Sequence, residues 1–176
     1  MNKRRQIPLD FRVDKLTNSI ENVFTGDSFT TEVTLLSAKD LPMVSKKNGW
    51  VFDWKYELNQ PEREVYKLTI TNNPNIIQGL VSIEIRRDHI YMHLLENAGF
   101  NKGKNKIYAG VAGNLVAFVC RHSFQRGFEG YISFISKSKL IDHYEKTLGA
   151  RHSGGRVMII DTKAALILLD KYFKNY

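Results

Sequence analysis

The stretch from Asn105 to Ala150 constrains the fold more than any other part of this chain. It contains a small-residue loop, an apolar helix, a short apolar run and a second helix, in that order. The first helix is predicted from about Ala112 to Arg126, and apolar side chains cover most of its circumference, which is typical of a largely buried helix. Gly127 is the kind of residue that ends a helix. If a strand precedes this stretch, it forms a parallel β-α-β crossover.

The elements around that helix complete the crossover. Tyr131–Ile135 is apolar on both faces, which suits a central strand in a parallel pairing. Lys139–Leu148 has one apolar face and is predicted to be a helix that ends at Gly149. His89–Leu95 can supply the strand before the loop. The tail adds a predicted strand and a predicted helix, Val157–Ile160 and Thr162–Phe173.

Upstream, alternation of apolar and polar residues predicts several strands. These are Phe29–Leu36, Trp50–Leu58, Glu64–Thr71 and Gln78–Arg86. The last three and His89–Leu95 form an antiparallel meander, joined by turns rich in Asn, Pro and Asp. Arg4–Arg12 is expected to be extended, Asp14–Val23 to be a short helix, and Ser37–Gly49 to be a polar connection. The expected fold is therefore of the α/β (α+β) class, with a mixed, mostly antiparallel sheet, one parallel crossover and flanking helices.

The loop before the apolar helix has the features of an anion site. Gly110–Asn114 is rich in small residues, which let a ligand approach the backbone closely. The first N–H groups of a helix lack internal partners and lie at the positive end of the helix dipole. Lys102, Lys104 and Lys106 add positive charge just upstream. A plain tight turn, with close packing of helix against sheet, would explain the same glycines.

Two known phosphate-binding loops are excluded by sequence. No Gly-Lys-Ser/Thr is present, so the loop is not of the Walker type. The glycine spacing is not Gly-x-Gly-x-x-Gly, so the dinucleotide-binding fingerprint is absent as well.

The order of these motifs resembles the GNAT superfamily of acyl-CoA-dependent N-acetyltransferases. The loop signature of that family is Gln/Arg-x-x-Gly-x-Gly/Ala, and Ile107–Ala112 falls in register with it, although Ile107 stands where Gln or Arg is usual. The end of the second helix, His143–Ala150, is similar to the family's Tyr-x-x-x-Gly-Phe, but it is one residue longer and has Ala150 in place of the aromatic residue. The resemblance covers Ile77–Ala150.

The resemblance implies an acetyl-CoA site. It places the pantetheine beside Leu94 and Leu95 and the phosphates near the loop, with Lys137 at the position of a common family asparagine. The implied cofactor-binding residues are Leu94, Leu95, Lys106, Tyr108, Gly110, Val111, Ala112, Gly113, Asn114, Leu115 and Lys137.

The resemblance also implies direct attack of an amine on the thioester. The leaving thiolate needs a proton donor, and Tyr144 matches the tyrosine that often serves in the family, although it also fits the apolar face of its helix. The amine must lose a proton to a base or a water chain. Glu96 is the first candidate for that base, with Glu84 and His93 as alternatives.

The front of the chain departs from the family pattern. The first two strands of the family are usually separated by two helices, and Ser37–Gly49 is too short for both if Phe29–Leu36 is the first strand. Either the first strand lies earlier, or the wall of the acceptor site is built differently.

Composition limits the remaining choices. A chain of 176 residues is expected to form a single domain, with residues 1–49 as an atypical segment and residues 77–150 as the cofactor-binding core. The single cysteine, Cys120, cannot form an internal disulfide, and no long apolar run is present, so a reducing, cytoplasmic location without a membrane is expected. The histidines lack metal-site spacing, so no metal is expected.

The sequence therefore predicts an N-acetyltransferase that uses acetyl-CoA and an amine of unknown identity. One alternative is a non-catalytic protein that binds acyl-CoA. The other is an RNA-directed enzyme that acetylates charged tRNA, suggested by the net charge of +8, although no RNA-binding motif is present. A homodimer is compatible with either reading.

Overall fold

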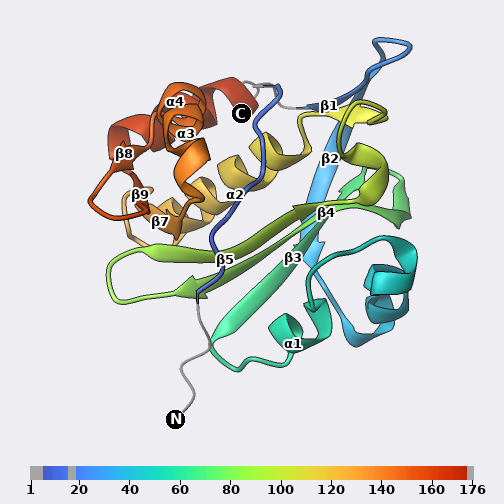
Figure 1. The fold of residues 1–176 in the computed structure, drawn as a ribbon, viewed down its shortest axis with the longest axis horizontal. Coiled ribbons are helices and arrows are strands. Elements are labelled where there is room, and N and C mark those ends of the chain that lie inside the picture. The colour runs from blue at the N-terminus through green and yellow to red at the C-terminus, as the bar shows by residue number, and fades with distance from the viewer. Residues whose placement is uncertain (1–5, 16–18, 174–176) are drawn as a thin grey trace.

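The computed structural model describes residues 6–15 and 19–173, and within these residues it contains one mixed sheet flanked by helices (Figure 1). The strands are β1 Ser19–Asn22, β2 Ser28–Leu35, β3 Arg63–Ile70, β4 Asn73–Ile85, β5 Ile90–Asn97, β6 Tyr108–Ala109, β7 Ile132–Ile135, β8 Arg151–His152 and β9 Val157–Ile160. The α-helices are α1 Trp54–Leu58, α2 Val111–Gln125, α3 Ile141–Leu148 and α4 Thr162–Tyr172. Short 3-10 helices are η1 Ala38–Val44, η2 Lys46–Asn48, η3 Gly99–Asn101 and η4 Ser138–Leu140.

The strand order in the sheet is β6-β1-β2-β3-β4-β5-β7-β9-β8. Strands β2 to β5 form an antiparallel meander, and β5 and β7 are parallel, with α2 as the crossover between them. This arrangement confirms the predicted mixed, mostly antiparallel sheet with one parallel β-α-β crossover and flanking helices. Figure 1 shows α2, α3 and α4 on one side of the β4–β5 ribbons, with α1 and the η1–η2 region on the other.

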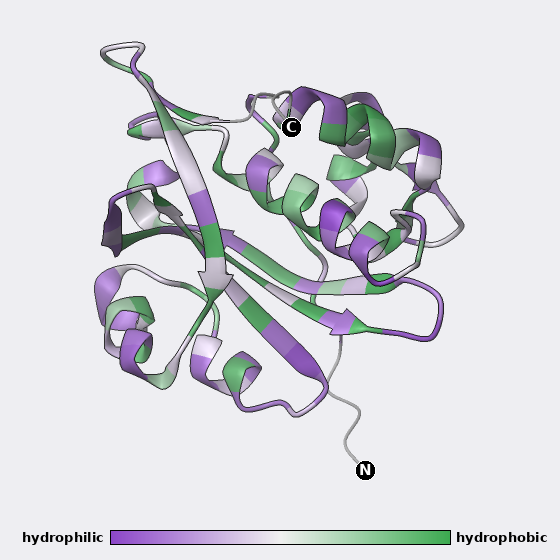
Figure 2. Cartoon of the chain, turned by 180° about the vertical axis from the view of Figure 1, so that it is seen from behind, coloured by the Kyte–Doolittle hydropathy of each residue, from purple (hydrophilic) through white to green (hydrophobic). Residues whose placement is uncertain are grey.

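The predicted apolar helix is α2, which is buried along most of its length. It packs against β4, β5 and α4, and Figure 2 shows apolar residues, drawn in green, along both α2 and α4. The helix ends where predicted, since Arg126 is the C-cap and Gly127 follows with a φ of 83°. Burial of residues 111–120 explains why the first part of α2 is apolar around most of its circumference.

The predicted strand Trp50–Leu58 is wrong. Residues 50–53 form an irregular link, and Trp54–Leu58 is helix α1. The Asp53 side chain caps this helix by accepting a hydrogen bond from Tyr56 N at 2.9 Å, a local interaction that favours a helix start. Trp54 is buried at 1% exposure, so the aromatic alternation reflects packing of a loop and a single helical turn. The fourth strand of the meander is β2.

The front of the chain also differs from expectation. The expected helix Asp14–Val23 is wrong, because residues 19–22 form strand β1, which pairs with β2 and β6; residues 16–18 lie outside the described residues. Between β2 and β3 the chain forms η1, η2 and α1 in place of a simple polar connection. A strand therefore lies earlier than Phe29–Leu36, as the first of the two alternatives proposed, and short helical turns connect β2 to β3.

The tight packing around Gly113 leads us to predict that a substitution at this position destabilises the fold. Replacing a glycine inside a helix by alanine normally stabilises the helix by about 1 kcal/mol. A Cβ at Gly113 would lie 1.8 Å from Tyr172 Oη and 2.9 Å from Lys15 O. We therefore expect Gly113→Ala to lower the free energy of unfolding by about 1–3 kcal/mol, because the rigid tyrosine ring must move. Urea unfolding measures the change, and Gly99→Ala, with 3.7 Å to the nearest atom, is the control.

Candidate functional site

The two parallel strands of the crossover separate shortly after they begin to pair. The β5–β7 ladder contains the pairs Ile90–Ile132 and Tyr91–Ser133. On its other side, β5 pairs with β4 through a bulge, because Ser82 faces Leu94 while Ile83 faces Met92, which leaves His93 as the extra residue. Bulges re-aim side chains and are enriched beside active sites. The opening between β5 and β7 therefore begins next to a bulge.

Helix α2 begins at Val111, within one residue of the start that the sequence predicted. Gly110 is its N-cap and has a φ of 100°, a conformation that strongly favours glycine. The Gly110 N–H donates to Asp14 Oδ1 at 2.9 Å. A carboxylate therefore occupies the position at the helix N-terminus where a phosphate oxygen was expected.

That carboxylate belongs to a segment of the same chain, Ile7–Lys15, which we call the inserted segment. Leu9 forms a parallel bridge with Ser136, just beyond β7. Leu9 N donates to Ile135 O at 2.7 Å, and Lys137 N donates to Leu9 O at 3.0 Å. In Figure 1 the inserted segment is the blue stretch that runs upward from β5, between α3 and α2. The inserted segment therefore lies on the β7 side of the opening as an additional strand-like stretch.

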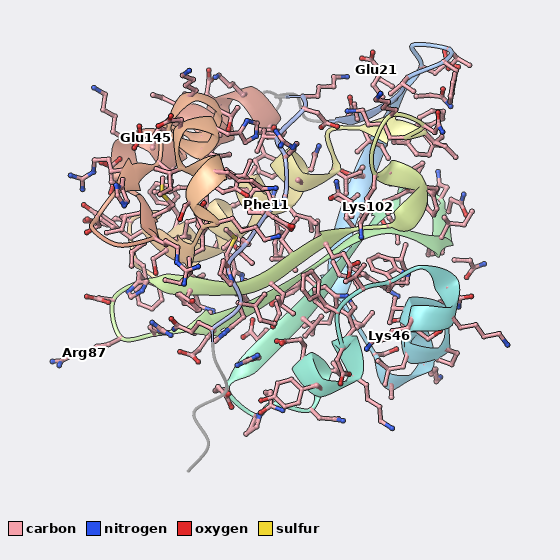
Figure 3. All side chains as sticks on the ribbon, in the orientation of Figure 1. Phe11, Glu21, Lys46, Arg87, Lys102 and Glu145 are labelled. Atoms are coloured by element: carbon pink, nitrogen blue, oxygen red, sulfur yellow. The ribbon has the colours of Figure 1, made fainter. Side chains whose placement is uncertain are left out.

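Alternate side chains of the inserted segment are buried in the opening. Leu9, Phe11 and Val13 have 2%, 6% and 7% exposure, respectively. The Phe11 ring lies 4.7 Å from the Tyr144 ring and 5.8 Å from the Phe134 ring. Figure 3 shows Phe11 between α3 and β5. The segment thus contributes to the hydrophobic core as well as to the sheet.

Several residues that the sequence assigned to acetyl-CoA instead contact the inserted segment. Lys106 Nζ lies 2.6 Å from Asp14 Oδ2, and Lys137 Nζ lies 2.7 Å from Asp10 Oδ2. The Tyr144 hydroxyl donates to the Phe11 carbonyl oxygen at 2.6 Å. Burial raises the pKa of Tyr144, which keeps its proton in place.

The other predicted cofactor residues are spread over β5, β6 and α2. Leu94 and Leu95 are buried on β5, and Tyr108 in β6 packs edge-on against Phe29. Gly113 packs against Tyr172. The remaining residues, Val111, Ala112, Asn114 and Leu115, are buried in the first turns of α2. The structure therefore brings Gly110, Lys106, Lys137 and Tyr144 into contact with the inserted segment, whereas Tyr108 lies at the β6 end of the strand order.

A cavity of about 540 Å³ lies between the inserted segment and the end of β5. Its walls come from the segment, from residues 95–97, from the link before α1 and from the loop after η3. Three lysines of that loop line it: Lys102, Lys104 and Lys106. The lining therefore carries four basic side chains, Arg12 and the three lysines, and three carboxylates, Asp10, Asp14 and Glu96, beside the strand that was expected to carry the cofactor.

The carboxylate of Glu96, the first candidate for the base, is already surrounded by hydrogen-bond donors. Its carboxylate accepts hydrogen bonds from Val51 N at 2.8 Å, Phe52 N at 3.2 Å and Trp54 Nε1 at 2.8 Å. Lys102 Nζ lies 2.7 Å from it, and the side chain is only 2% exposed. Its geometry is that of an anchor for the wall before α1.

His93 and Glu84 form a second candidate pair at the bulge. His93 Nε2 lies 3.2 Å from Glu84 Oε1, and its ring packs edge-on against Tyr91 at 4.7 Å. Burial lowers the pKa of His93, and the positive charge of Arg63 acts in the same direction. The imidazole is therefore neutral near pH 7, and its Nδ1 holds a lone pair when Nε2–H donates to the carboxylate. A neutral, oriented imidazole can accept a proton.

The surroundings of three histidines lead us to predict that the protein loses stability in mild acid. Burial is the main cause that lowers the pKa of His93, His122 and His143. Below about pH 6.5 the unfolded chain protonates these rings while the folded chain resists, so stability falls as pH falls. His143 Nε2 accepts the Val13 N–H at 2.9 Å, which requires a neutral ring. The urea concentration at the midpoint of unfolding should decrease as the pH is lowered from about 7.5 to about 5.5. The decrease should be smaller for His143→Gln.

The inserted segment is the part of the site that sequence reasoning missed. The sequence predicted an extended stretch for Arg4–Arg12 and a helix from Asp14, so the segment was not identified as one element. Its residues 9–14 read Leu-Asp-Phe-Arg-Val-Asp, a strict alternation that is typical of a strand with one buried face. The alternation could have identified an edge strand, but no local signal indicates which part of the sheet it joins.

Residues 6–15 and 19–173 contain neither a membrane-spanning helix nor a cluster of metal ligands. Within these ranges, no helix is both long and apolar enough to cross a membrane. In the same part of the chain, no group of three or more His, Cys, Asp or Glu side chains is placed to hold a metal ion.

Comparison with known proteins supports the fold through structure alone. No protein-family model matches the sequence, and no curated protein matches it. The chain is similar to a spermidine N-acetyltransferase from Vibrio cholerae, solved with CoA and spermine, with a TM-score of 0.54 at 16% identity over 77% of this chain and 98% of that one. It is similar to the ribosomal-protein-S18-alanine N-acetyltransferase from Escherichia coli, with a TM-score of 0.54 at 14% identity over 74% and 91% of the two chains.

A third similar structure is FeeM, an N-acyl amino acid synthase from uncultured soil microbes, with a TM-score of 0.56 at 10% identity. That match covers 78% of this chain and 93% of FeeM. These structures are similar to the chain in fold, at identities too low to transfer an activity. The chain therefore has the fold of the GNAT acetyltransferases.

Proposed function

We propose that this protein is an acyl-CoA-dependent N-acetyltransferase that transfers an acetyl group from acetyl-CoA to a primary amine. The observation that carries the proposal is the opening between β5 and β7, which begins beside a bulge and faces the glycine-capped start of α2. Such an opening offers strand edges to a pantetheine amide and helix N–H groups to a pyrophosphate. Lys102, Lys104 and Lys106, which line the cavity at the end of β5, supply positive charge for the phosphates.

In this proposal the predicted cofactor residues keep their expected parts, except that Asn114 and Leu115 offer no free N–H group. The pantetheine lies along Leu94 and Leu95, and the pyrophosphate lies against the N–H groups from Gly110 to Gly113, because the Asn114 N–H already donates to Gly110 O at 3.1 Å. Lys106 and Lys137 contact phosphate oxygens. The side chains that surround the opening support these assignments, because two of these lysines already bind carboxylates there.

The chemistry is a direct attack. The amine nitrogen bonds to the thioester carbonyl carbon, and its excess proton passes to His93 Nδ1, which Glu84 orients. A backbone N–H at the bulge stabilises the developing oxyanion. When the C–S bond breaks, Tyr144 supplies a proton to the leaving thiolate. We prefer His93 to Glu96 as the base because four donors already engage the Glu96 carboxylate.

Calorimetric titration with acetyl-CoA, followed by an assay of CoA thiol release, tests the proposal. The amine panel follows the solved relatives: spermidine, a peptide that begins with alanine, and free amino acids. We expect thiol release with at least one amine and a loss of about 10²-fold in kcat for Tyr144→Phe. Gly110→Glu is an unsuitable control, since a side chain at a φ of 100° is strained whether or not a cofactor binds.

Two results would favour the alternatives. Binding of acetyl-CoA without turnover of any amine would indicate a non-catalytic acyl-CoA-binding protein. Absence of binding to every variant, including those described below, would overturn the proposal and direct attention to nucleic-acid partners.

A further inference from the structure

The inserted segment and acetyl-CoA would use the same protein groups. Gly110 N, Lys106 and Lys137 were assigned to phosphates from sequence, and Tyr144 was assigned to the thiolate. In the structure, Gly110 N and Lys106 both bind the Asp14 carboxylate. Lys137 binds the Asp10 carboxylate, and the Tyr144 hydroxyl donates to the Phe11 carbonyl oxygen. Two carboxylates and one carbonyl oxygen therefore stand where two phosphates and a sulfur were expected.

The segment is held by backbone and core contacts as well as by charge. It adds a strand to the β7 side through Leu9, which exchanges hydrogen bonds with Ile135 and Lys137. Val13 N donates to His143 Nε2 at 2.9 Å, and the Lys15 carbonyl oxygen accepts from the Tyr172 hydroxyl at 2.5 Å. These contacts span the full length of the opening, from the end of β7 to the first turns of α2.

From this overlap we infer that the inserted segment is an internal competitor of acyl-CoA, which closes the cofactor groove until it is displaced. The inference rests on the proposed function. The groove is then a binding site for an extended peptide that presents carboxylates to Lys106 and Lys137, and the occupant in this structure is the chain itself. Acyl-CoA binds the fraction of molecules in which the segment has left, so its apparent affinity is reduced in proportion to that fraction.

The first test weakens the segment by removing its charge. We expect Asp10→Asn/Asp14→Asn to bind acetyl-CoA about 10-fold more tightly than the wild type, because the ion pairs to Lys106 and Lys137 are lost. The matched control is Asp142→Asn/Glu145→Gln, which removes the same charge from exposed positions on α3. The control should change the dissociation constant by less than about twofold. An equal gain in both variants would reduce the effect to net charge and overturn the inference.

The second test locks the segment in place. Bridge partners on neighbouring strands lie about 5 Å apart, within the range that a disulfide spans. The variant Leu9→Cys/Ser136→Cys replaces such a pair, and the native Cys120 is fully buried and does not compete. We expect no measurable acetyl-CoA binding when the variant is oxidised, and recovery after reduction. Each single cysteine variant is the control for the substitutions themselves.

A third measurement uses the unmodified protein. The Leu9 and Val13 amide hydrogens are bonded to β7 and His143, so they should exchange slowly with solvent. Saturating acetyl-CoA should accelerate their exchange. Amides in α2 should stay protected and serve as the internal reference.

The outcomes separate the inference from the proposed function. Equal binding of acetyl-CoA to the oxidised and reduced forms, or unchanged exchange at Leu9 and Val13 in the complex, would overturn the competition and leave the function intact. In that case acetyl-CoA would lie beside the segment in the 540 Å³ cavity. Absence of binding to any form would overturn the proposed function, and the competition with it.

Discussion

Replacing Glu96 by alanine is expected to lower the free energy of unfolding by about 3–5 kcal/mol. The substitution leaves Trp54 Nε1, Val51 N and the Lys102 ammonium group without the carboxylate that they share. Because these groups lie in or beside the core, water does not fully replace the lost hydrogen bonds. The wall before α1 would lose its connection to β5. Urea unfolding followed by tryptophan fluorescence reports the change directly, since Trp54 is one of the ligands of the carboxylate.

The chain offers a matched surface control for this result. Glu62 is 48% exposed and lies 3.7 Å from Arg63, so Glu62→Ala should change stability by less than about 0.5 kcal/mol. Glu96→Gln should fall between the two, because it keeps one acceptor oxygen but removes the charge opposite Lys102. If Glu96→Ala is as mild as Glu62→Ala, the hydrogen bonds described for Glu96 do not stabilise the wall.

The second large effect concerns catalysis. Replacing His93 by glutamine is expected to lower kcat by about 10²–10⁴-fold, the usual contribution of a general base. The fold should remain, because glutamine is of similar length and can still bond to Glu84. The measurement is the rate of CoA thiol release at saturating acetyl-CoA with an amine that the wild type accepts.

The pH profile distinguishes a base from a structural histidine. Because burial lowers the pKa of His93, wild-type kcat should stay high down to below about pH 6.5 and then fall as the ring becomes protonated. His93→Gln should lose that acidic limb. His89→Gln is the control, since His89 pairs with Asp88 at the β4–β5 turn. A full rate in His93→Gln, with the acidic limb unchanged, would exclude His93 as the base.

Local sequence patterns predicted the crossover well. Helix α2, strand β7 and helix α3 form where periodicity and glycine stops indicated them, because each is long or apolar enough for local preference and burial to agree. The loop before α2 could also be identified, since the φ of 100° at Gly110 is a conformation that strongly favours glycine. Helix starts and turns of this kind depend on residues that are close together in the sequence, so local patterns can predict them.

The remaining errors have a shared physical cause, which is long-range contact. Residues 50–58 alternate like a strand, but Glu96, more than 40 residues away, binds Val51 and Trp54 and holds them in a different conformation. The inserted segment alternates correctly, yet its partners on β7 and α3 follow far along the chain. Short alternating stretches do not determine their partners, so tertiary structure decides them.

The distance along the chain between the inserted segment and its partners has a consequence for the order of folding. Val13 and His143 are separated by 130 residues, and Phe11 and Tyr144 by 133. A ribosome therefore releases the segment long before α3 exists, and closing so large a loop is slow compared with forming α2 or the meander. The segment is expected to be the last part of the sheet to assemble and, by the same reasoning, among the first to detach from the native state. A groove that is closed by the last-folding element can open without unfolding the rest of the molecule.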